Sequence, residues 1–308
     1  MRLLVISMDA CSNKDFERLI SLKNIRKIME KGAFCKNVQT IYPSITYPVH
    51  ASLLTGTYPK THGISHNQIF DKDKTPKERA WHWQTSDIKA KTLFEAARDE
   101  GFSCASLFWP VVGKDKNVKY LLPEVLALKG ENQTLKALDY GSKVWLIMSE
   151  LKHRKLRDGA KQPKLDEFSS ALAADLIKKN GPDMIFLHLV AVDSLRHEHG
   201  VDSREAIYAM ECLDKNIGLL LEKIEKTGLE YAVCLVSDHG QADVSEHFCL
   251  NSEFEKAGLK MRAQSLGFGA YIHLLGEDCE HARDFLFKNM ERLKISHVYE
   301  KAELESLK

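Results

Sequence analysis

The sequence lacks the features that mark a disulfide-stabilised protein or a thiolate zinc site. Its seven cysteines form an odd number, and no two of them are separated by just two residues. Disulfide frameworks and thiolate zinc sites use paired, closely spaced cysteines. We therefore expect reduced, buried thiols, and we predict that Cys234, inside an apolar run, is a small core residue.

The sequence also lacks an excess of either charge and a long hydrophobic run. Lys and Arg number 44 against 43 Asp and Glu, a formal net charge of +1, which argues against nucleic-acid binding through a broad basic face. No apolar run approaches the roughly 18 residues of a membrane span. The first run is too short for a secretion signal and meets Asp9 immediately. We predict a cytoplasmic protein that binds neither nucleic acid nor membranes.

What the sequence does contain is enough apolar material for a large core. Of 308 residues, 44% are hydrophobic, which predicts one large α/β domain or a domain with a small appendage. Apolar runs at 2–9, 183–193 and 231–240 are typical of buried parallel strands, and 101–110 predicts a further strand. Amphipathic patterns predict helices over 16–32, 91–101 and 203–228.

The alternation of strands and helices predicts a doubly wound, mostly parallel sheet flanked by helices. We assign this α/β core to residues 1–250. Within it, the stretch 145–166 is predicted to be a surface excursion with an exposed charged face. The segment after residue 250 reads as strand, helix, strand and short helix, so we predict a small α+β cap over 251–308.

Each of the three predicted parallel strands ends in an aspartate: Asp9, Asp193 or Asp238. Ligands of open α/β sheets bind at the carboxyl ends of strands, where converging carboxylates repel one another without a positive partner. His239 follows Asp238, and His197 lies four residues after Asp193, on one face of a helical turn. Carboxylates with imidazoles are a typical zinc environment, and two such clusters suggest two metal ions. Taken singly, each aspartate is equally explained as a helix cap or turn former.

The stretch YPSITYPVHASLLTG, residues 42–56, places Thr46 at the mouth of an apolar helix. Thr46 is the expected N-cap of that helix, with Pro48 in the first turn and Gly56 at the end. A helix N-terminus also offers free N–H groups and positive potential, which suit a phosphate. A threonine hydroxyl is a poor nucleophile unless a metal lowers its pKa, so zinc held by nearby carboxylates would make Thr46 reactive.

Four motifs, in this order and spacing, resemble the type I phosphodiesterase/nucleotide pyrophosphatase family of the alkaline phosphatase superfamily. They are DA at 9–10, YPSITYPVHASLLTGTYPKTHGI at 42–64, VDSLRH at 192–197 and SDHG at 237–240. The second block is long and specific, whereas SDHG alone would be a weak signal. The resemblance covers essentially the whole chain and implies an alkaline-phosphatase-like α/β fold.

The resemblance implies a hydrolase that cleaves phosphodiester or pyrophosphate bonds in a small phosphorylated substrate, with two zinc ions as cofactors. Thr46 would attack phosphorus, and water would then attack the phospho-threonine. The implied ligands of the first metal are Thr46, Asp9, Asp238 and His239, and those of the second are Asp193 and His197. Oxygen and imidazole ligands also accept manganese. We further predict that Asn67 lines the substrate site, and that His50 and His62 brace the nucleophile block through hydrogen bonds.

Two features depart from the family pattern. Val49 stands where nucleotide-handling members carry Asn, a donor worth roughly 3 kcal/mol at such sites. The family's remaining histidine ligand for the second metal lies in a His-Gly motif near the C-terminus, and none of the later histidines precedes a glycine: His247, His273, His281 and His297. A two-ligand zinc site binds weakly. Two alternatives therefore stay open: a phosphomonoesterase on the same scaffold, and a catalytically weakened phosphate-binding protein.

Overall fold

The apolar runs form a five-stranded sheet in the computed structural model, which describes residues 1–179, 181–276 and 278–304. The strands are β1 (Arg2–Met8), β2 (Cys104–Leu107), β3 (Val118–Leu122), β4 (Met184–Leu189) and β5 (Tyr231–Val236). Their order is β3-β2-β4-β1-β5, and every neighbouring pair is parallel. The predicted parallel sheet is confirmed, and β3 is a strand that the sequence pattern missed.

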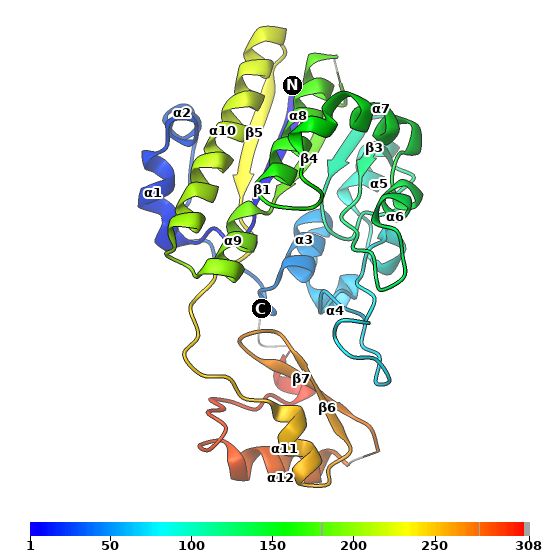
Figure 1. Cartoon of the computed structure of the whole chain (residues 1–308), viewed down its shortest axis with the longest axis vertical. Coiled ribbons are helices and arrows are strands. Elements are labelled where there is room, and N and C mark those ends of the chain that lie inside the picture. The colour runs from blue at the N-terminus through cyan, green and yellow to red at the C-terminus, as the bar shows by residue number, and fades with distance from the viewer. Residues whose placement is uncertain (180, 277, 305–308) are drawn as a thin grey trace.

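Helices cover both faces of this sheet (Figure 1). On one face, α8 (Lys164–Lys178) and α10 (Arg204–Thr227) share a core cluster with Ile185 and Leu187 of β4. On the other face, α3 (Thr46–Thr55) and α5 (Leu93–Asp99) pack with Phe186. Neighbouring residues of β4 join different clusters because successive side chains of a strand point to opposite faces. The predicted doubly wound arrangement is therefore confirmed.

The remaining helical elements connect these layers. They are η1 (Asn13–Asp15), α1 (Phe16–Ser21), α2 (Lys23–Lys31), α4 (Pro59–His62), η2 (Thr85–Asp87), α6 (Gln133–Tyr140), α7 (Lys143–His153), η3 (Arg154–Leu156) and α9 (Ala191–His199). The helix predicted over 16–32 is broken, because Leu22 adopts an extended backbone between α1 and α2. The helix predicted over 203–228 is α10: the Ser203 side chain caps it, and Gly228 ends it at a φ of 66°.

One surface expectation is met and one is wrong. The stretch 145–166 lies at the surface and exposes charged side chains such as Lys152, Arg154 and Lys155, although much of it is helical. Helix α7 also exposes the apolar side chains of Ile147, Met148 and Leu151. Cys234 is exposed rather than a core residue, because β5 is an edge strand with partly exposed side chains. All seven cysteines are free thiols, four of which are exposed.

A smaller unit, here called the cap, follows the sheet. It comprises α11 (Leu250–Lys256), β6 (Met261–Ser265), β7 (Ala270–Leu274), α12 (Cys279–Asn289) and α13 (Lys301–Leu304). Its two strands form an antiparallel hairpin, and Phe254 and Met261 belong to a separate apolar cluster. The strand predicted between α12 and the last helix is not present in the described residues 290–300. Both strands precede α12, where they pair through a short turn.

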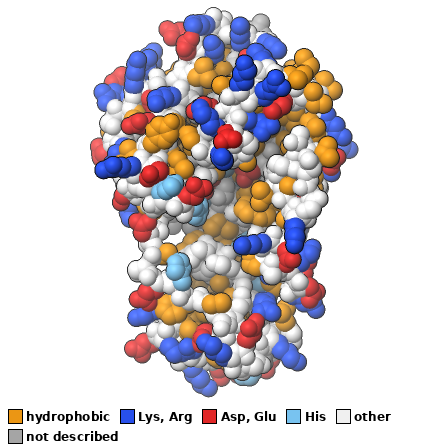
Figure 2. Space-filling model, viewed as in Figure 1, with side chains coloured by type: hydrophobic (Ala, Val, Ile, Leu, Met, Phe, Trp, Pro, Cys, Tyr) orange, Lys and Arg blue, Asp and Glu red, His pale blue; other side chains and the backbone are white. Residues whose placement is uncertain are grey.

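The cap lies below the carboxyl edge of the large sheet (Figure 1). Two hydrogen bonds join β6 to the loop after α4: His66 Nε2 with the Ser265 carbonyl at 2.8 Å, and Gln264 Nε2 with the Gln68 carbonyl at 3.1 Å. The ring of Tyr42 packs edge-on against that of Phe268. Acidic and basic side chains are interspersed over the face shown in Figure 2. None of the helices in the described part of the chain has the length and apolarity that crossing a membrane requires.

His62 braces the block that begins with α3. Its Nδ1 accepts the Ile64 N–H at 3.1 Å, and its Nε2 lies 2.9 Å from Ser52 Oγ on α3. The brace predicted for His62 is therefore present. The side chain is fully buried, and burial lowers the pKa of His62 to about 4.

This pKa shift predicts an acid-sensitive contribution to stability. Between pH 4 and 6.5 the folded state keeps His62 neutral while the unfolded state protonates it, so the free energy of unfolding falls as pH falls. The contribution is up to about 1.4 kcal/mol per pH unit. Replacing His62 with Gln removes the titrating ring, so urea unfolding across this range should give a shallower pH slope. Equal slopes for the two proteins would contradict the assignment.

Candidate active site

Four of the predicted site residues meet where β1 and β5 end. One ligand atom each from Asp9, Asp238 and His239 lies within 4.8 Å of the other two. His239 Nε2 is 3.5 Å from Asp9 Oδ1 and 3.3 Å from Asp238 Oδ2. The same nitrogen is 3.1 Å from Thr46 Oγ1, at the start of α3. Adjacent parallel strands bring the two carboxylates together, because β1 and β5 end at the same edge.

The two carboxylates are buried and only half satisfied. Asp9 Oδ2 accepts a hydrogen bond from His188 Nε2 at 3.0 Å, and Asp238 Oδ1 accepts one from the Ala10 N–H at 3.2 Å. The other oxygens, Asp9 Oδ1 and Asp238 Oδ2, are buried without a hydrogen-bond partner. Burial, and then the charges of Asp238 and Asp193, raise the pKa of Asp9 well above its ordinary value. This arrangement is costly unless a positive group lies between the free oxygens.

The hydrogen bonds of His239 leave its Nε2 available as a ligand. Nδ1 lies 3.1 Å from the Gly240 carbonyl, which accepts only from a protonated nitrogen, so Nε2 is the ring nitrogen that can bind a metal. Nε2 faces two unpartnered carboxylate oxygens and the Thr46 hydroxyl. Two oxygens, an imidazole nitrogen and a hydroxyl form a donor set that fits zinc, and equally manganese. The residues present therefore fit one divalent cation.

Thr46 differs from expectation in one respect: it is the first residue of α3 and not its N-cap. Ile45 holds the cap position with an extended backbone, and no side chain caps the helix. The Thr46 hydroxyl is turned to His239 instead, so it is free for chemistry. The helix ends, as predicted, at Gly56 with a φ of 65°. His50 braces this start, because its Nδ1 donates to the Thr46 carbonyl at 2.8 Å.

Asn67 lies beside the same helix start. Its Oδ1 accepts the Tyr47 N–H at 3.0 Å, so its amide nitrogen is the donor that the side chain can offer to a ligand. Asn67 sits between His66 and Gln68, the two residues that hydrogen-bond to β6. The docking of the cap therefore also helps to set the position of Asn67.

Asp193 and His197 lie together, but in a different setting from the one predicted. β4 ends at Leu189, so Asp193 falls in the first turn of α9 rather than at a strand end. A strand cannot continue there, because the buried carboxylate of Asp166 accepts the N–H groups at the start of α9. His197 Nε2 is 3.4 Å from Asp193 Oδ1, to which Gln241 Nε2 donates at 2.6 Å.

This second pair is less complete than the first group. The side chain of His197 is 72% exposed. Within residues 1–179, 181–276 and 278–304, the one group of three His, Cys, Asp or Glu side chains placed to hold an ion is Asp9, Asp238 and His239. In the described chain, Asp193 and His197 therefore have no third ligand of these types.

Sequence reasoning missed residues that support the first group. His188 of β4 is wholly buried, and its Nδ1 lies 3.0 Å from Glu124 Oε2. Burial disfavours its charged form, but hydrogen bonds to Asp9 and Glu124 outweigh that effect and raise the pKa of His188 well above its usual value. The available signal was a histidine inside an otherwise apolar strand. Arg196 was also missed; its guanidinium donates to the Ala10 carbonyl at 2.6 Å.

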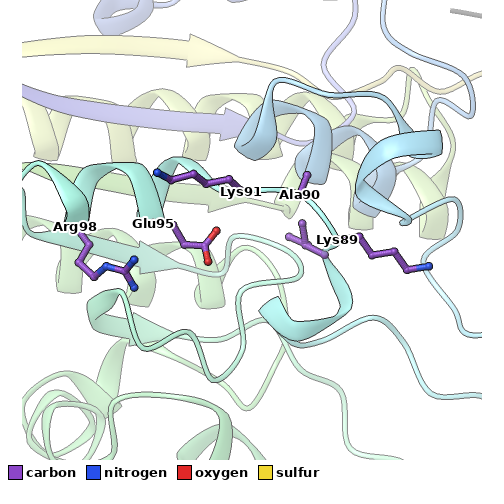
Figure 3. A pocket seen from close by; sticks show the side chains of 6 residues that line it. Lys89, Ala90, Lys91, Glu95 and Arg98 are labelled. Atoms are coloured by element: carbon purple, nitrogen blue, oxygen red, sulfur yellow. The ribbon is translucent and has the colours of Figure 1, made fainter.

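A surface hollow of about 360 Å³ lies apart from this group. The loop before α5 and α5 itself line it, as Figure 3 shows. Its lining residues are Ile88, Lys89, Ala90, Lys91, Glu95 and Arg98. Its basic side chains are partly neutralised, since Lys91 and Arg98 both pair with Asp99. None of the predicted site residues lines this hollow.

Comparison with solved structures defines the class of fold. The chain is similar to murine ectonucleotide pyrophosphatase/phosphodiesterase 5, with a TM-score of 0.65 and 18% identity over 93% of this chain and 69% of that one. An inactive threonine-to-alanine variant of that murine protein has been solved in complex with AMP. Phosphonoacetate hydrolase from Sinorhizobium meliloti 1021 gives a TM-score of 0.62 at 18% identity, over 96% of this chain and 77% of that one. The fold is alkaline-phosphatase-like α/β, as predicted.

The family follows from the sequence comparison. The model of the type I phosphodiesterase/nucleotide pyrophosphatase family matches residues 3–305, so the chain belongs to this family. Venom phosphodiesterase 2 of Crotalus adamanteus is 26% identical over 255 residues, which cover 79% of this chain and 27% of the venom protein. The chain thus spans little more than a quarter of the length of that relative.

Because Asp9 and Asp238 each keep one carboxylate oxygen without a partner, we expect Asp238→Asn to have opposite effects on the stability of the chain and on its metal binding. Replacing Asp238 with Asn removes one of two buried like charges, which should stabilise the metal-free chain by up to about 3 kcal/mol. The same change removes a ligand oxygen, so zinc affinity should fall by roughly 100-fold or more. Urea unfolding in chelator and zinc titration against a chromogenic chelator measure the two effects.

Asp115→Asn is the matched control. Asp115 is also buried, but its carboxylate is satisfied by Thr85 and the Asn117 N–H. This variant should keep its zinc affinity. Loss of stability in metal-free Asp238→Asn, together with unchanged zinc affinity, would contradict the proposed metal group.

Proposed function

We propose that the chain is a metal-dependent phosphohydrolase that cleaves phosphodiester or pyrophosphate bonds through a phospho-threonine on Thr46. The observation that supports this best is the contact between the Thr46 hydroxyl and His239 Nε2, beside two buried, unpartnered carboxylate oxygens. Family membership supports hydrolysis of such bonds. The AMP complex of the murine neighbour supports a small phosphorylated substrate, for which nucleotides are the first class to test.

The proposed role of each residue follows from its position. A divalent cation bound by Asp9, Asp238 and His239 would lower the pKa of the Thr46 hydroxyl and offset phosphoryl charge. Thr46 Oγ1 forms a bond to phosphorus as the bond to the leaving oxygen breaks. The hydroxyl proton goes to solvent, and the leaving oxygen takes up a proton from water. Water then hydrolyses the threonine ester, which releases the phosphate product and restores Thr46.

The negative phosphoryl oxygens need hydrogen-bond donors. The start of α3 supplies positive potential and the Thr46 N–H, since Asn67 accepts the Tyr47 N–H and Pro48 has none. The amide nitrogen of Asn67 is the side-chain donor beside it. Val49 is buried within α3, so we assign Asn67 the role of substrate-binding amide. Donors aimed at developing charge contribute roughly 3 kcal/mol each at comparable sites.

We also propose that residues 1–250 are the catalytic core and 251–308 a cap that borders the substrate site. The separate apolar cluster of the cap supports this division. Hydrogen bonds join β6 to His66 and Gln68, and Asn67 lies between these two residues. These contacts support the proposal that the cap borders the substrate site. We propose zinc as the first metal, with manganese as the alternative that the same donors accept.

A catalytically weakened phosphate-binding protein is the second candidate. The observation in its favour is the second pair, because in the described chain no further His, Cys, Asp or Glu completes a group of three with Asp193 and His197. Two metal ions stabilise both the attacking and the leaving oxygen. Loss of one metal ion therefore lowers the turnover rate more than it weakens phosphate binding. A phosphomonoesterase shares the same site, and the substrate preference distinguishes it.

The nucleophile assignment predicts the behaviour of two variants. Thr46→Ala should lower the hydrolysis of bis(p-nitrophenyl) phosphate by roughly 1000-fold or more, because no covalent intermediate can form. Thr46→Ser keeps a hydroxyl and should retain measurable turnover. Rates with added zinc or manganese, and rapid-quench mass spectrometry of residue 46, give the measurement.

The same experiment separates the alternatives. A mass gain of a nitrophenyl-phosphoryl group on the wild type identifies a diesterase, whereas preference for p-nitrophenyl phosphate and a phosphoryl adduct identify a monoesterase. Wild-type rates in Thr46→Ala would refute the nucleophile. Zinc-bound chain that retains phosphate but turns over neither substrate would favour the weakened binding protein.

A further inference from the structure

His188 connects two carboxylates in the interior of the protein. It lies on β4 directly opposite Ser7 in the register with β1, on the sheet face that α3 covers. Its Nε2 is 3.0 Å from Asp9 Oδ2, and its Nδ1 is 3.0 Å from Glu124 Oε2. Both ring nitrogens therefore face acidic oxygens, in a side chain with no exposed surface.

Glu124 extends this contact to the nucleophile helix. Its second oxygen, Oε1, accepts a hydrogen bond from the Tyr47 hydroxyl at 3.2 Å. Tyr47 is buried and follows Thr46 in the chain, and its N–H donates to Asn67. A continuous set of hydrogen bonds thus runs from Asp9 through His188 and Glu124 to the first turn of α3.

The geometry at Asp9 shows what this set achieves. His188 holds Oδ2, which leaves Oδ1 as the oxygen without a partner, 3.5 Å from His239 Nε2. A carboxylate that lost His188 could rotate, and either oxygen could then seek another donor. Outer partners of metal ligands act in this way, by fixing the orientation and the charge of the ligand.

We propose that His188 and Glu124 form a positioning pair for the first metal group. His188 keeps one oxygen of Asp9 directed at the cation, and Glu124 fixes both His188 and, through Tyr47, the start of α3. The pair rests on the proposed function, since it acts on the cation that Asp9, Asp238 and His239 are proposed to bind. Neither residue touches the reacting atoms.

A purely structural role would give a different pattern. His62 is equally buried and also has hydrogen bonds at both ring nitrogens, but it lies outside this set of contacts. His62→Gln therefore reports the general cost of replacing a buried, bonded histidine. Glutamine cannot donate to two carboxylates on opposite sides. If His188 positions Asp9, His188→Gln therefore binds the metal more weakly than His62→Gln does, whereas a purely structural role gives no such difference.

Zinc affinity, measured by competition with a chromogenic chelator, tests the proposal without using activity. We expect His188→Gln to bind zinc roughly 10- to 100-fold more weakly than wild type and His62→Gln to bind it as tightly as wild type. Glu124→Gln should give a smaller loss, since its amide oxygen can still accept from His188. Glu124 is partly exposed, so this variant supplies the test if His188→Gln does not fold.

A double-mutant cycle shows whether His188 acts through Asp9. If it does, Asp9→Asn/His188→Gln binds zinc no more weakly than Asp9→Asn alone, whereas independent effects add. Additive losses, or a His188→Gln variant with wild-type zinc affinity, would overturn the positioning pair and leave the proposed function intact. A wild-type chain that binds neither zinc nor manganese would overturn both.

Discussion

The structure depends on one electrostatic constraint, which is the presence of two buried carboxylates that each keep one oxygen without a hydrogen-bond partner. These oxygens are Asp9 Oδ1 and Asp238 Oδ2. Asp9 and Asp238 lie at the ends of adjacent strands, and neither can move to water. The neighbouring imidazole of His239 directs its Nε2 toward them. Such a group is unfavourable by itself and becomes favourable around a cation. The chain therefore accepts a cost in stability at this position, which the proposed binding of a cation would offset.

The surrounding fold is arranged so that this group cannot relax. Parallel strands deliver both carboxylates to one edge of the sheet, and α3 begins directly beside them. The backbone of Ala10 has a φ of 59°. The Arg196 guanidinium donates to the Ala10 carbonyl, and the Ala10 N–H donates to Asp238. A non-glycine residue in this region of backbone space is strained. The contacts on both sides of the peptide hold it there, which keeps one oxygen of Asp238 occupied and the other free.

The two predicted metal groups differ in how they are built. The first takes its donors from β1, β5 and α3, so three packed elements hold them from different directions. The second takes Asp193 and His197 from one turn of α9, and the histidine is mostly exposed. An amide from Gln241 already occupies the Asp193 oxygen that faces this histidine. Two donors on one exposed turn define a cation position much less firmly than largely buried donors from three packed elements. The first group is therefore the one on which the proposed function depends.

Local patterns in the sequence determined four of the five parallel strands and helix α10 between Ser203 and Gly228, and they pointed to Asp9, Asp238 and Thr46 as candidate site residues. These features depend on apolar runs, capping residues and short motifs, all of which are contained in neighbouring residues. Tertiary structure alone decided that β5 is an edge strand that exposes Cys234. It also decided which carboxylate oxygens stay unpaired, because that depends on partners such as His188, which is 179 residues from Asp9 in the chain. Periodicity reports which face of an element is apolar, but hydrogen-bond satisfaction is settled only when distant segments pack.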